Sequence, residues 1–577
     1  MRYLFFALIV ITCLSLSVNA QSGDDQPVPT LVPPTPLPVE PTEAPDSVLA
    51  QSTIARLQES GVLRVGVLYN EIPFGEYTIR GEVTGFDADL ARLLAETWQL
   101  ELELVQVTRQ NQFERLTDGT VDLLLSAVVH QRQLDAQFEF SHSYRVGAQV
   151  VMVETDSPIA SVFNLGGQSV GYVVGTEGES ALNDWVQRSG VALQMRPYLT
   201  YDRLLAGLFG GEVVAIAGRD TRLLRTAFNA LDAVEILDTP LRQEPFGAVL
   251  LRQDVHFRNL INRTLQYLAS DAEIGQQSTL EQLHTSYFPN DSFPYAALPI
   301  YRNVGDEAPQ PAQFPTGVPL PPTYVAPRIL AEGVVRVAGI SSDPNVLPPE
   351  QMMVATVNQA LIEQMAQRWE VSVQYVEGDP IQAVSTGQAD LAIGIAPDWE
   401  SAASVDFSQV YVQHGRRLLH PANRDLDQFG DLRTTSRIVA TLTSESDAQE
   451  LAEAWADYVG IFNLRFFGTT LDDAAENILE NNNALVLFGD SFSLVWIARQ
   501  NPDFAIGPTW YDRRFLAFAV PQNDIDFRRL VNYTLQEMVR DQSLSDIIAS
   551  ILPEGERAPE IGIWTGSSEY LGLSLRR

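Results

Sequence analysis

The chain has 577 residues, more than one hydrophobic core organises, and its 45% hydrophobic and 19% charged residues are typical of folded globular domains. Its formal net charge is −35, and arginine supplies all 38 basic residues. Such an acidic chain repels the phosphates of nucleic acids and anionic membrane surfaces, so we expect no nucleic-acid partner. After residue 20 no stretch is long and apolar enough to cross a bilayer.

Residues 1–20 predict a secretory signal segment, because an apolar run from Leu4 to Val18 precedes small residues that end at Ala20. We expect cleavage after Ala20 and an exported protein, either periplasmic or exposed at the cell surface. A retained anchor helix and a lipoprotein acylated at Cys13 stay open as alternatives. Cys13 is the only cysteine, so the secreted form has no disulfide and no thiolate nucleophile or metal ligand.

Two proline-rich stretches divide the remainder. Residues 21–50 predict an extended tether, and residues 291–325 predict a second linker, because neither composition can bury a core. They bracket two predicted domains, at 51–290 and 326–555. A predicted tail, 556–577, completes the chain.

The two predicted domains repeat one another. GVLRV at 61–65 returns as GVVRV, and the tryptophan followed by an alternating run at 98–105 also returns. All five matches keep an offset between 267 and 272 residues, a register that chance does not hold. The matched stretches are 61–65 with 333–337, 98–105 with 369–376, 119–123 with 387–391, 140–141 with 407–408, and 260–266 with 530–536.

Strand and helix patterns alternate within each domain. In the first, the periodicity predicts a strand at 63–68, a helix at 87–98, a strand at 100–107 and a buried strand at 121–129. This alternation predicts an α/β fold with mostly parallel sheets flanked by helices.

These residues resemble a known family. LRVGVLYNEIPFGEY, GFDADLARLLAETW, FERLTDGTVDLLLSA and FEFSHSY are similar to the extracellular solute-binding proteins of family 3, which deliver polar amino acids to ABC importers. The likeness covers essentially all of 51–290. It implies two tandem bilobal domains of the type II periplasmic-binding-protein fold, with strands crossing between the lobes near 144–152 and 245–251. A small polar solute would bind between the lobes, an ABC permease would be the protein partner, and we expect a monomer.

The resemblance also implies where a ligand carboxylate would bind. The family's carboxylate-binding arginine corresponds in position to Leu134, and Arg132, two residues earlier, is the candidate to replace it. The alternative is that Arg132 is a solvated surface arginine. Ser126 lies at the strand end where the family has a hydroxyl or backbone contact. In the second lobe Thr176 and Glu177 begin a helix whose backbone N–H groups suit an anion, although the charge of Glu177 opposes one; a plain strand-to-helix turn is the alternative.

Four further residues complete the predicted site. Asp220 follows the strand that carries the family's ammonium acceptor, and Asp490 is its match in the second domain at an offset of 270, although the family spacing points to Arg219. Glu71 and Phe74 lie in the loop that covers the ligand side chain in the family, and a place in the lobe core is the alternative for Phe74. The second domain keeps only Asp490 clearly, which predicts a weaker or different ligand there, or none.

Other functions are disfavoured or kept as alternatives. The stretch 167–171 fits G-x-S-x-G, but a strand follows the serine where a nucleophile elbow needs a helix. Six scattered histidines predict no metal site, and no cofactor is implied. We expect no catalysis. The alternatives are a dehydratase of the cyclohexadienyl type, with Glu71 or Glu177 as its acid, and a surface sensor or scaffold with degenerate domains.

Overall fold

The computed structural model describes residues 51–341, 347–434, 438–480, 483–551 and 562–566. The predicted signal segment, the tether up to residue 50, and most of the predicted tail lie outside the described residues. Among the described helices, none has both the length and the hydropathy needed to cross a membrane. The predicted domain boundaries remain predictions, and we call the two repeated parts the first copy and the second copy.

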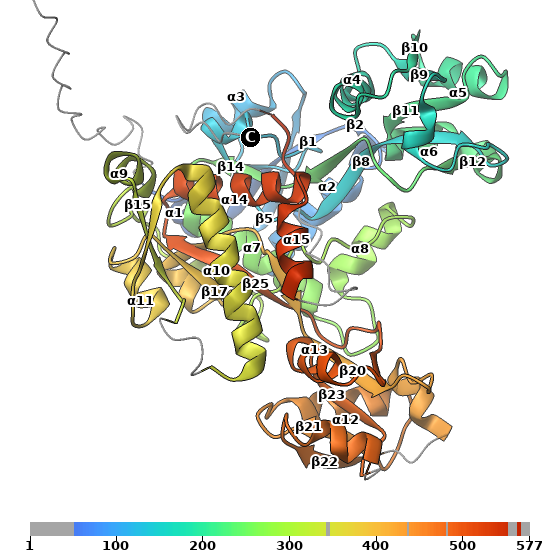
Figure 1. Ribbon diagram of the computed structural model, residues 1–577. Coiled ribbons are helices and arrows are strands. Elements are labelled where there is room, and N and C mark those ends of the chain that lie inside the picture. Colours follow the sequence, from blue (N-terminus) through green and yellow to red (C-terminus); the bar gives the residue numbers. More distant parts are fainter. Residues whose placement is uncertain (1–50, 342–346, 435–437, 481–482, 552–561, 567–577) are drawn as a thin grey trace, which may run out of the picture. The chain divides into compact units, whose positions relative to one another are not determined.

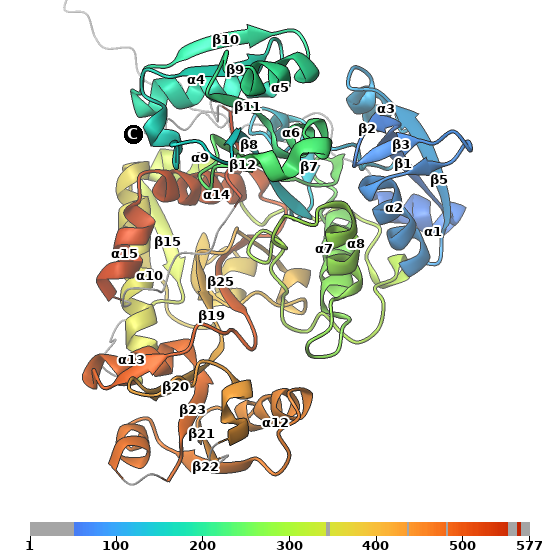
Figure 2. The same ribbon diagram turned by 90° about the vertical axis from the view of Figure 1, so that its right-hand side faces the viewer.

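Lobe A of the first copy is a mixed sheet in the order β5-β1-β6-β14-β7, with a small sheet β2-β3-β4 beside it. Its helices α1 and α2 lie near β1 and β5 (Figure 2). The strands are β1 Val62–Leu68, β2 Asn70–Glu71, β3 Gly75–Tyr77, β4 Val83–Thr84, β5 Glu101–Val107, β6 Leu123–Leu124, β7 Phe138–Phe140 and β14 Val249–Leu251. The helices are α1 Thr53–Ser60, α2 Phe86–Thr97, α3 Gln112–Thr117, α7 Val255–Ser270 and α8 Thr279–Tyr287.

Lobe B of the first copy is a sheet in the order β10-β9-β11-β8-β12, to which β13 adds by pairing with β8. Apolar residues of α4 pack on one face of this sheet, and those of α5 and α6 pack on the other (Figure 1). The elements are β8 Arg145–Glu154, β9 Ser169–Val173, β10 Gln194–Tyr198, β11 Ala215–Arg219, β12 Val234–Ile236, β13 Arg242–Phe246, α4 Glu177–Ser189, α5 Tyr201–Phe209 and α6 Asp220–Thr226.

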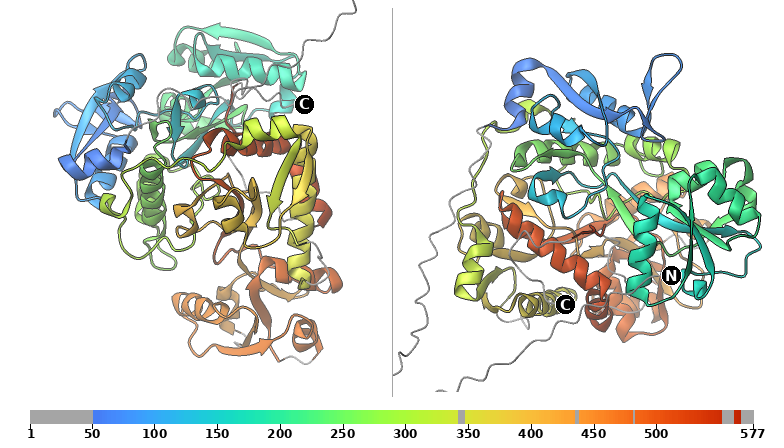
Figure 3. Two further views of the ribbon diagram at one scale, coloured as in Figure 1. Left: turned by 90° about the vertical axis from the view of Figure 1, so that its left-hand side faces the viewer. Right: turned by 90° about the horizontal axis from the view of Figure 1, so that it is seen from above.

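The second copy repeats this plan. Its lobe A has the order β16-β15-β17-β25-β18 with β19 paired to β25, and its lobe B has the order β22-β21-β23-β20-β24, with α12 and α13 beside it (Figures 1 and 3). The strands are β15 Val334–Ala338, β16 Ser372–Tyr375, β17 Leu391–Ile395, β18 Val405–Phe407, β19 Val412–His414, β20 Arg416–Pro421, β21 Ile438–Leu442, β22 Arg465–Thr469, β23 Val486–Asp490, β24 Phe504–Ile506 and β25 Arg514–Pro521. The helices are α9 Val325–Glu332, α10 Pro349–Trp369, α11 Pro380–Ser385, α12 Ala448–Tyr458, α13 Ser491–Gln500, α14 Ile525–Arg540 and α15 Ser543–Ile551.

The predicted α/β class is confirmed, with two refinements. The sheets have a parallel core, but the strands that cross between the lobes, such as β8, and the returning strand β14 are antiparallel to their neighbours. The strand predicted at 121–129 is only Leu123–Leu124. Three residues after it, Ala127 adopts a left-handed conformation, with φ of 49°, which a continuous strand does not contain.

The repeat has the same local chemistry in both copies. Asp122 forms ion pairs with Arg56 and with Arg64, to which its distance is 2.7 Å, and Asp390 forms the same pairs with Arg328 and Arg336, the latter at 2.8 Å. Each aspartate joins the first helix of its copy to the first strand, which explains why GVLRV and the aspartate recur together.

Removing a buried hydrogen bond that both copies share should cost stability. Trp98 donates its indole N–H to the Thr264 hydroxyl at 2.8 Å, as Trp369 does to Thr534 at 2.9 Å. Thr264→Val leaves that N–H buried without an acceptor, so we expect the free energy of unfolding to fall by about 1–3 kcal/mol. Urea unfolding followed by tryptophan fluorescence measures this. Thr117→Val, on the exposed face of α3, is the matched control, and an equal effect of the two variants would refute the argument.

The lobes A of the two copies contact each other through reciprocal pairs. Arg258 on α7 binds Asp406 on β18 at 2.6 Å, and its counterpart Arg528 on α14 binds Glu139 on β7 at 2.7 Å. All four residues are buried or nearly so. The counterparts differ by 270 residues for the arginines and 267 for the acids, so the contact follows an approximate two-fold relation between the copies.

The segment that follows each copy also takes part in this contact. Gln266 accepts from the backbone of Tyr301 and from the indole of Trp399 in the other copy. Gln536 accepts from the backbone of Trp564 and from Arg132 in the other copy. Gln266 and Gln536 therefore each connect the lobe A of their own copy, the segment that follows that copy, and a loop of the other copy.

Candidate ligand-binding clefts

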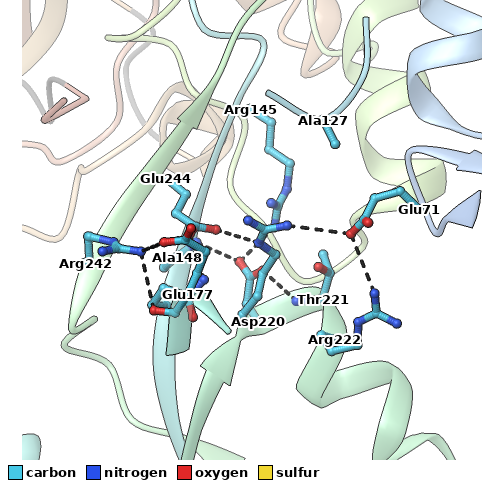
Figure 4. A network of polar contacts seen from close by, with 12 residues as sticks. Glu71, Ala127, Arg145, Ala148, Glu177, Asp220, Thr221, Arg222, Arg242 and Glu244 are labelled. Carbon is cyan, nitrogen blue, oxygen red and sulfur yellow. Dashed lines mark hydrogen bonds and ion pairs between the residues drawn. The ribbon is translucent and has the colours of Figure 1, made fainter. Parts of the chain in front are cut away.

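We give the name first cleft to the junction between lobes A and B of the first copy, where strand ends bring charged side chains of both lobes together. Glu71 on β2 has one carboxylate oxygen 3.7 Å from both Arg219 and Arg222 of lobe B, and the other 3.6 Å from Arg109 of lobe A. Figure 4 shows Glu71 beside Arg222. Arg109 also donates to the carbonyl oxygens of Ser126 and Ala127. One carboxylate of lobe A thus faces three guanidinium groups drawn from both lobes.

A buried ion pair lies behind this cluster. Arg145, at the start of β8 and fully buried, is 2.8 Å from Asp220 and 2.6 Å from Asp291, and its guanidinium lies 4.3 Å from the centre of the Phe288 ring. Asp220 also accepts from the backbone N–H groups of Ala148 and Thr221. Burial raises the pKa of Asp291, an effect that Arg145 opposes. Asp220 therefore acts first as the partner of Arg145, which crosses between the lobes.

A second chain of charges runs along the crossing strands. Glu244 on β13 accepts from Gln149 at 2.7 Å and from Arg219 at 2.7 Å, and it is itself buried. Arg242 binds Glu177 at 2.6 Å. Burial lowers the pKa of Arg219, but the neighbouring Glu244 more than offsets this and raises it above the usual value. Arg219 therefore stays charged in the cleft.

Asp87 supports the turn at Ala127, whose carbonyl oxygen accepts from Arg109. It accepts from the Ala127 backbone N–H at 2.6 Å and from the Tyr144 hydroxyl at 3.0 Å. Burial raises the pKa of Asp87 to about 7, against the lowering effect of these hydrogen bonds and of Arg109.

The sequence-predicted residues lie at different distances from this cluster. Glu71 and Asp220 belong to it. Thr176 donates its hydroxyl to the carbonyl of Val173, and Ser126 donates to Gln112, so both hydroxyls have intramolecular partners. Glu177 is about half exposed and pairs with Arg242. Phe74 is buried in the lobe A core, where its ring packs 4.8 Å from that of Phe246, as the alternative for this residue predicted.

Arg132 lies at the contact between the copies and away from the residues described above. Its guanidinium is buried, 2.8 Å from Glu537 and 3.0 Å from Gln536, and it lies over the ring of Tyr533 at 4.5 Å. Its backbone N–H donates to Thr565. Every partner named here belongs to the second copy or to the segment that follows it. The solvated surface position that was the alternative is excluded by this burial.

The second cleft is an open cavity of about 580 Å3 in the second copy. Asp490 lies at the end of β23, caps α13, and is 2.8 Å from Nδ1 of His414. Burial alone would raise the pKa of Asp490, but His414 and Arg416 hold it below its usual value. The described lining residues are Gly339, Ser341, Leu347, Gln351, Val354, Ala355, Asn358, Gly394, His414, Arg416, Ser444, Glu445, Ser446, Asp447, Asp490, Phe492, Ser493, Arg514 and Leu516.

Strand register corrects one step of the sequence argument. Arg219 pairs with Gln149 and caps α6, whereas Asp490 pairs with Arg416 and caps α13. The structural counterpart of Asp490 is therefore Arg219, as the family spacing indicates, and Asp220 begins the following helix. The equivalence of Asp220 with Asp490 was wrong by one residue, because β11 has no bulge at its end.

Several residues of the first cleft were missed in the sequence, and some of them had a usable signal. Arg109 follows β5, and Arg219 ends β11; both are carboxyl ends of parallel strands, where ligands bind in α/β sheets. Arg145 directly follows Tyr144 at the predicted crossing. Glu244, in the second crossing, had no signal that separated it from the other acids of this chain.

Comparisons with known proteins agree with this architecture. A model of the bacterial extracellular solute-binding proteins, family 3, matches residues 63–290 and again residues 347–553. The chain is 24% identical over 233 residues to the glutamate/aspartate import solute-binding protein of Escherichia coli strain K12, a match that covers 39% of this chain and 77% of the relative. It is 26% identical over 200 residues to the glutamine-binding protein of Geobacillus stearothermophilus, covering 34% and 75%.

A solved structure also matches part of the chain. An ancestral cationic amino acid solute-binding protein is 25% identical, with a TM-score of 0.35, and the match covers 41% of this chain and all of that chain. The family matches fall one in each copy and together span more than half of the chain. The protein therefore belongs to the bacterial extracellular solute-binding proteins, family 3.

Proposed function

We propose that this protein is an exported binding protein that captures a small polar, amino-acid-like solute in the first cleft and delivers it, as a monomer, to an ABC importer. The observation that carries the proposal is the convergence of Arg109, Arg219 and Arg222 from two lobes on one point, now filled by the Glu71 carboxylate. A ligand carboxylate has the charge and the hydrogen-bonding capacity to compete for these groups. The names of the relatives, a glutamate/aspartate import protein and a glutamine-binding protein, support a solute of this class.

In the proposed mechanism the solute links the lobes. Arg109 holds the ligand from lobe A, and Arg219 and Arg222 hold it from lobe B, so the ligand binds the closed state better than the open one. A permease can then distinguish the loaded protein by its shape.

Loss of Arg109 should weaken binding in this cleft. We expect Arg109→Ala to raise the dissociation constant of the responding amino acid roughly 10- to 100-fold, because a charge-assisted hydrogen bond contributes about 1.5–3 kcal/mol. Calorimetry on the secreted form, after a thermal-shift screen of amino acids, measures the change. Ligand at about a hundred times its dissociation constant adds about 2.7 kcal/mol, which raises the unfolding midpoint by about 5–10 °C.

Arg115→Ala is the matched control, because Arg115 is an exposed arginine on α3 of the same lobe. We expect it to leave the dissociation constant unchanged. A screen in which no polar solute shifts the midpoint would overturn the proposal in favour of a sensor or scaffold. Turnover of prephenate or arogenate by the secreted form would favour the dehydratase.

A further inference from the structure

The two walls of the second cleft differ in charge. The described lining residues on β17, on α10 and in the chain that joins β15 to α10 are uncharged, among them Gln351, Val354 and Asn358. The acids and bases that line the cavity lie on lobe B and on β19, β20 and β25, the strands that lead from one lobe to the other. Any charged group of a ligand must therefore find its partner on that second wall.

The guanidinium groups on that wall already have carboxylate partners. Arg416, almost fully buried, pairs with Asp447 and lies 3.4 Å from Glu445 and 3.7 Å from Asp490. Arg514 is 2.6 Å from Asp447 and is also paired with Asp512 outside the lining. Among the described lining residues, three carboxylates face two guanidinium groups, so the excess charge is negative.

The turn that suits a carboxylate in the first copy carries an acid in the second. Glu445 follows β21 at the position that Thr176 holds after β9. Its carboxylate oxygens accept from the backbone N–H of Asp490 at 3.0 and 3.2 Å and from the Ser493 hydroxyl at 3.1 Å. Burial raises the pKa of Glu445, and Asp490 adds to this while Arg416 opposes it. A ligand carboxylate entering here would meet Glu445, and an ammonium group would be stabilised by it.

His414 adds an acceptor at the same point. In the neutral ring that donates Nδ1–H to Asp490, Nε2 is an acceptor, and this buried atom has no hydrogen-bond partner among the described residues. The ring stacks on Phe492 at 4.9 Å between centroids. Both residues line the cavity, so they offer an aromatic surface beside the acids.

The copies have exchanged charges at two equivalent positions. Arg219 and Glu244 of the first cleft correspond by strand register to Asp490 and Arg514 of the second. In the first cleft Arg219 and Glu244 bind each other at 2.7 Å. In the second cleft, Arg514 forms ion pairs with Asp447 and Asp512. The nearest ion-pair partner of Asp490 is His414.

We propose that the second cleft is a separate binding site for an organic amine that lacks a carboxylate group, with its ammonium between Glu445, Asp490 and the Nε2 atom of His414. This inference rests on the proposed function in that both clefts take small solutes. It departs from it in the class of solute, because carboxylates outnumber guanidinium groups among the described lining residues of the second cleft, whereas three guanidinium groups face the Glu71 carboxylate in the first.

Matched ligand pairs test this directly. Agmatine is arginine without its carboxylate, and cadaverine is lysine without its carboxylate. We expect calorimetry on the secreted form to show agmatine or cadaverine binding at least 10-fold more tightly than its amino-acid counterpart. The affinity should fall at least 10-fold in Asp490→Asn. Asparagine caps a helix as well as aspartate does, so this variant keeps the start of α13, and an unchanged unfolding midpoint verifies its folding.

Arg109→Ala separates this proposal from the first one. It should weaken the amino-acid response of the first cleft roughly 10- to 100-fold and leave amine binding unchanged. In the Arg109→Ala variant, arginine binding as tightly as agmatine would overturn the amine site, as would amine affinity that survives Asp490→Asn or no response to either amine. None of these results would contradict the proposal that the first cleft binds an amino acid through Arg109.

Discussion

Replacing Asp406 with alanine is expected to lower the free energy of unfolding by about 3–5 kcal/mol, because it leaves Arg258 as a buried charge without its closest partner. The only other carboxylate in an ion pair with Arg258 among the described residues is that of Glu139, at 4.0 Å, and Glu139 already binds Arg528. Burial lowers the pKa of Arg258, and Asp406 more than offsets that effect. Urea unfolding of the secreted form, followed by tryptophan fluorescence, measures the loss.

A double-mutant cycle shows whether the loss comes from the pair. We expect Arg258→Ala combined with Asp406→Ala to cost less than the sum of the single variants, since the second change removes the orphaned charge. Asp118→Ala, which breaks an exposed pair with Arg115, should change stability much less than Asp406→Ala does. If Asp406→Ala cost no more than Asp118→Ala, the contact between the copies would not contribute to stability.

The stability that Asp87 contributes should decline as the pH rises from about 4 to about 7, while His142 and His284, whose pKa values burial lowers to about 3 and about 4, act in the opposite direction. Asp87 has a folded-state pKa of about 7, against about 3.9 in an unfolded chain, so ionisation is harder in the folded protein. A carboxyl with a raised pKa stabilises the fold only while it stays protonated, and the contribution of Asp87 falls by roughly 4 kcal/mol across this range. Burial raises the pKa of Asp524 to about 7 as well, so it acts in the same direction.

Asp87→Asn tests the assignment. Asparagine can accept from the Ala127 N–H and donate to Tyr144, but it does not titrate. We therefore expect this variant to lack the part of the pH dependence of stability that Asp87 contributes. Asp524→Asn should remove a further part of the pH dependence of stability. Glu139 provides the contrast: burial alone would raise its pKa, but Arg528, Arg529 and Arg258 hold it far below its usual value, and its contribution is lost only in strong acid. A pH profile of Asp87→Asn that overlays the parent profile would contradict the assignment.

The sequence by itself determined the duplication, the α/β class and the family, because these depend on local patterns. The recurrence of GVLRV with its later aspartate reflects a contact inside each copy, between Arg64 and Asp122 or Arg336 and Asp390. The helix at Phe86–Thr97 and the strands beside it follow from periodicities of 3.6 and 2 residues.

Only the tertiary structure decided which charges face the clefts. Arg132 and Arg109 are both arginines in polar stretches near strand ends, yet one binds the second copy and the other lies beside Glu71. The sequence match placed Asp220 opposite Asp490, whereas strand register places Arg219, one residue earlier, at the position that corresponds to Asp490. The direction of a side chain depends on strand register and on partners hundreds of residues away, and neither is written in the local pattern of the sequence.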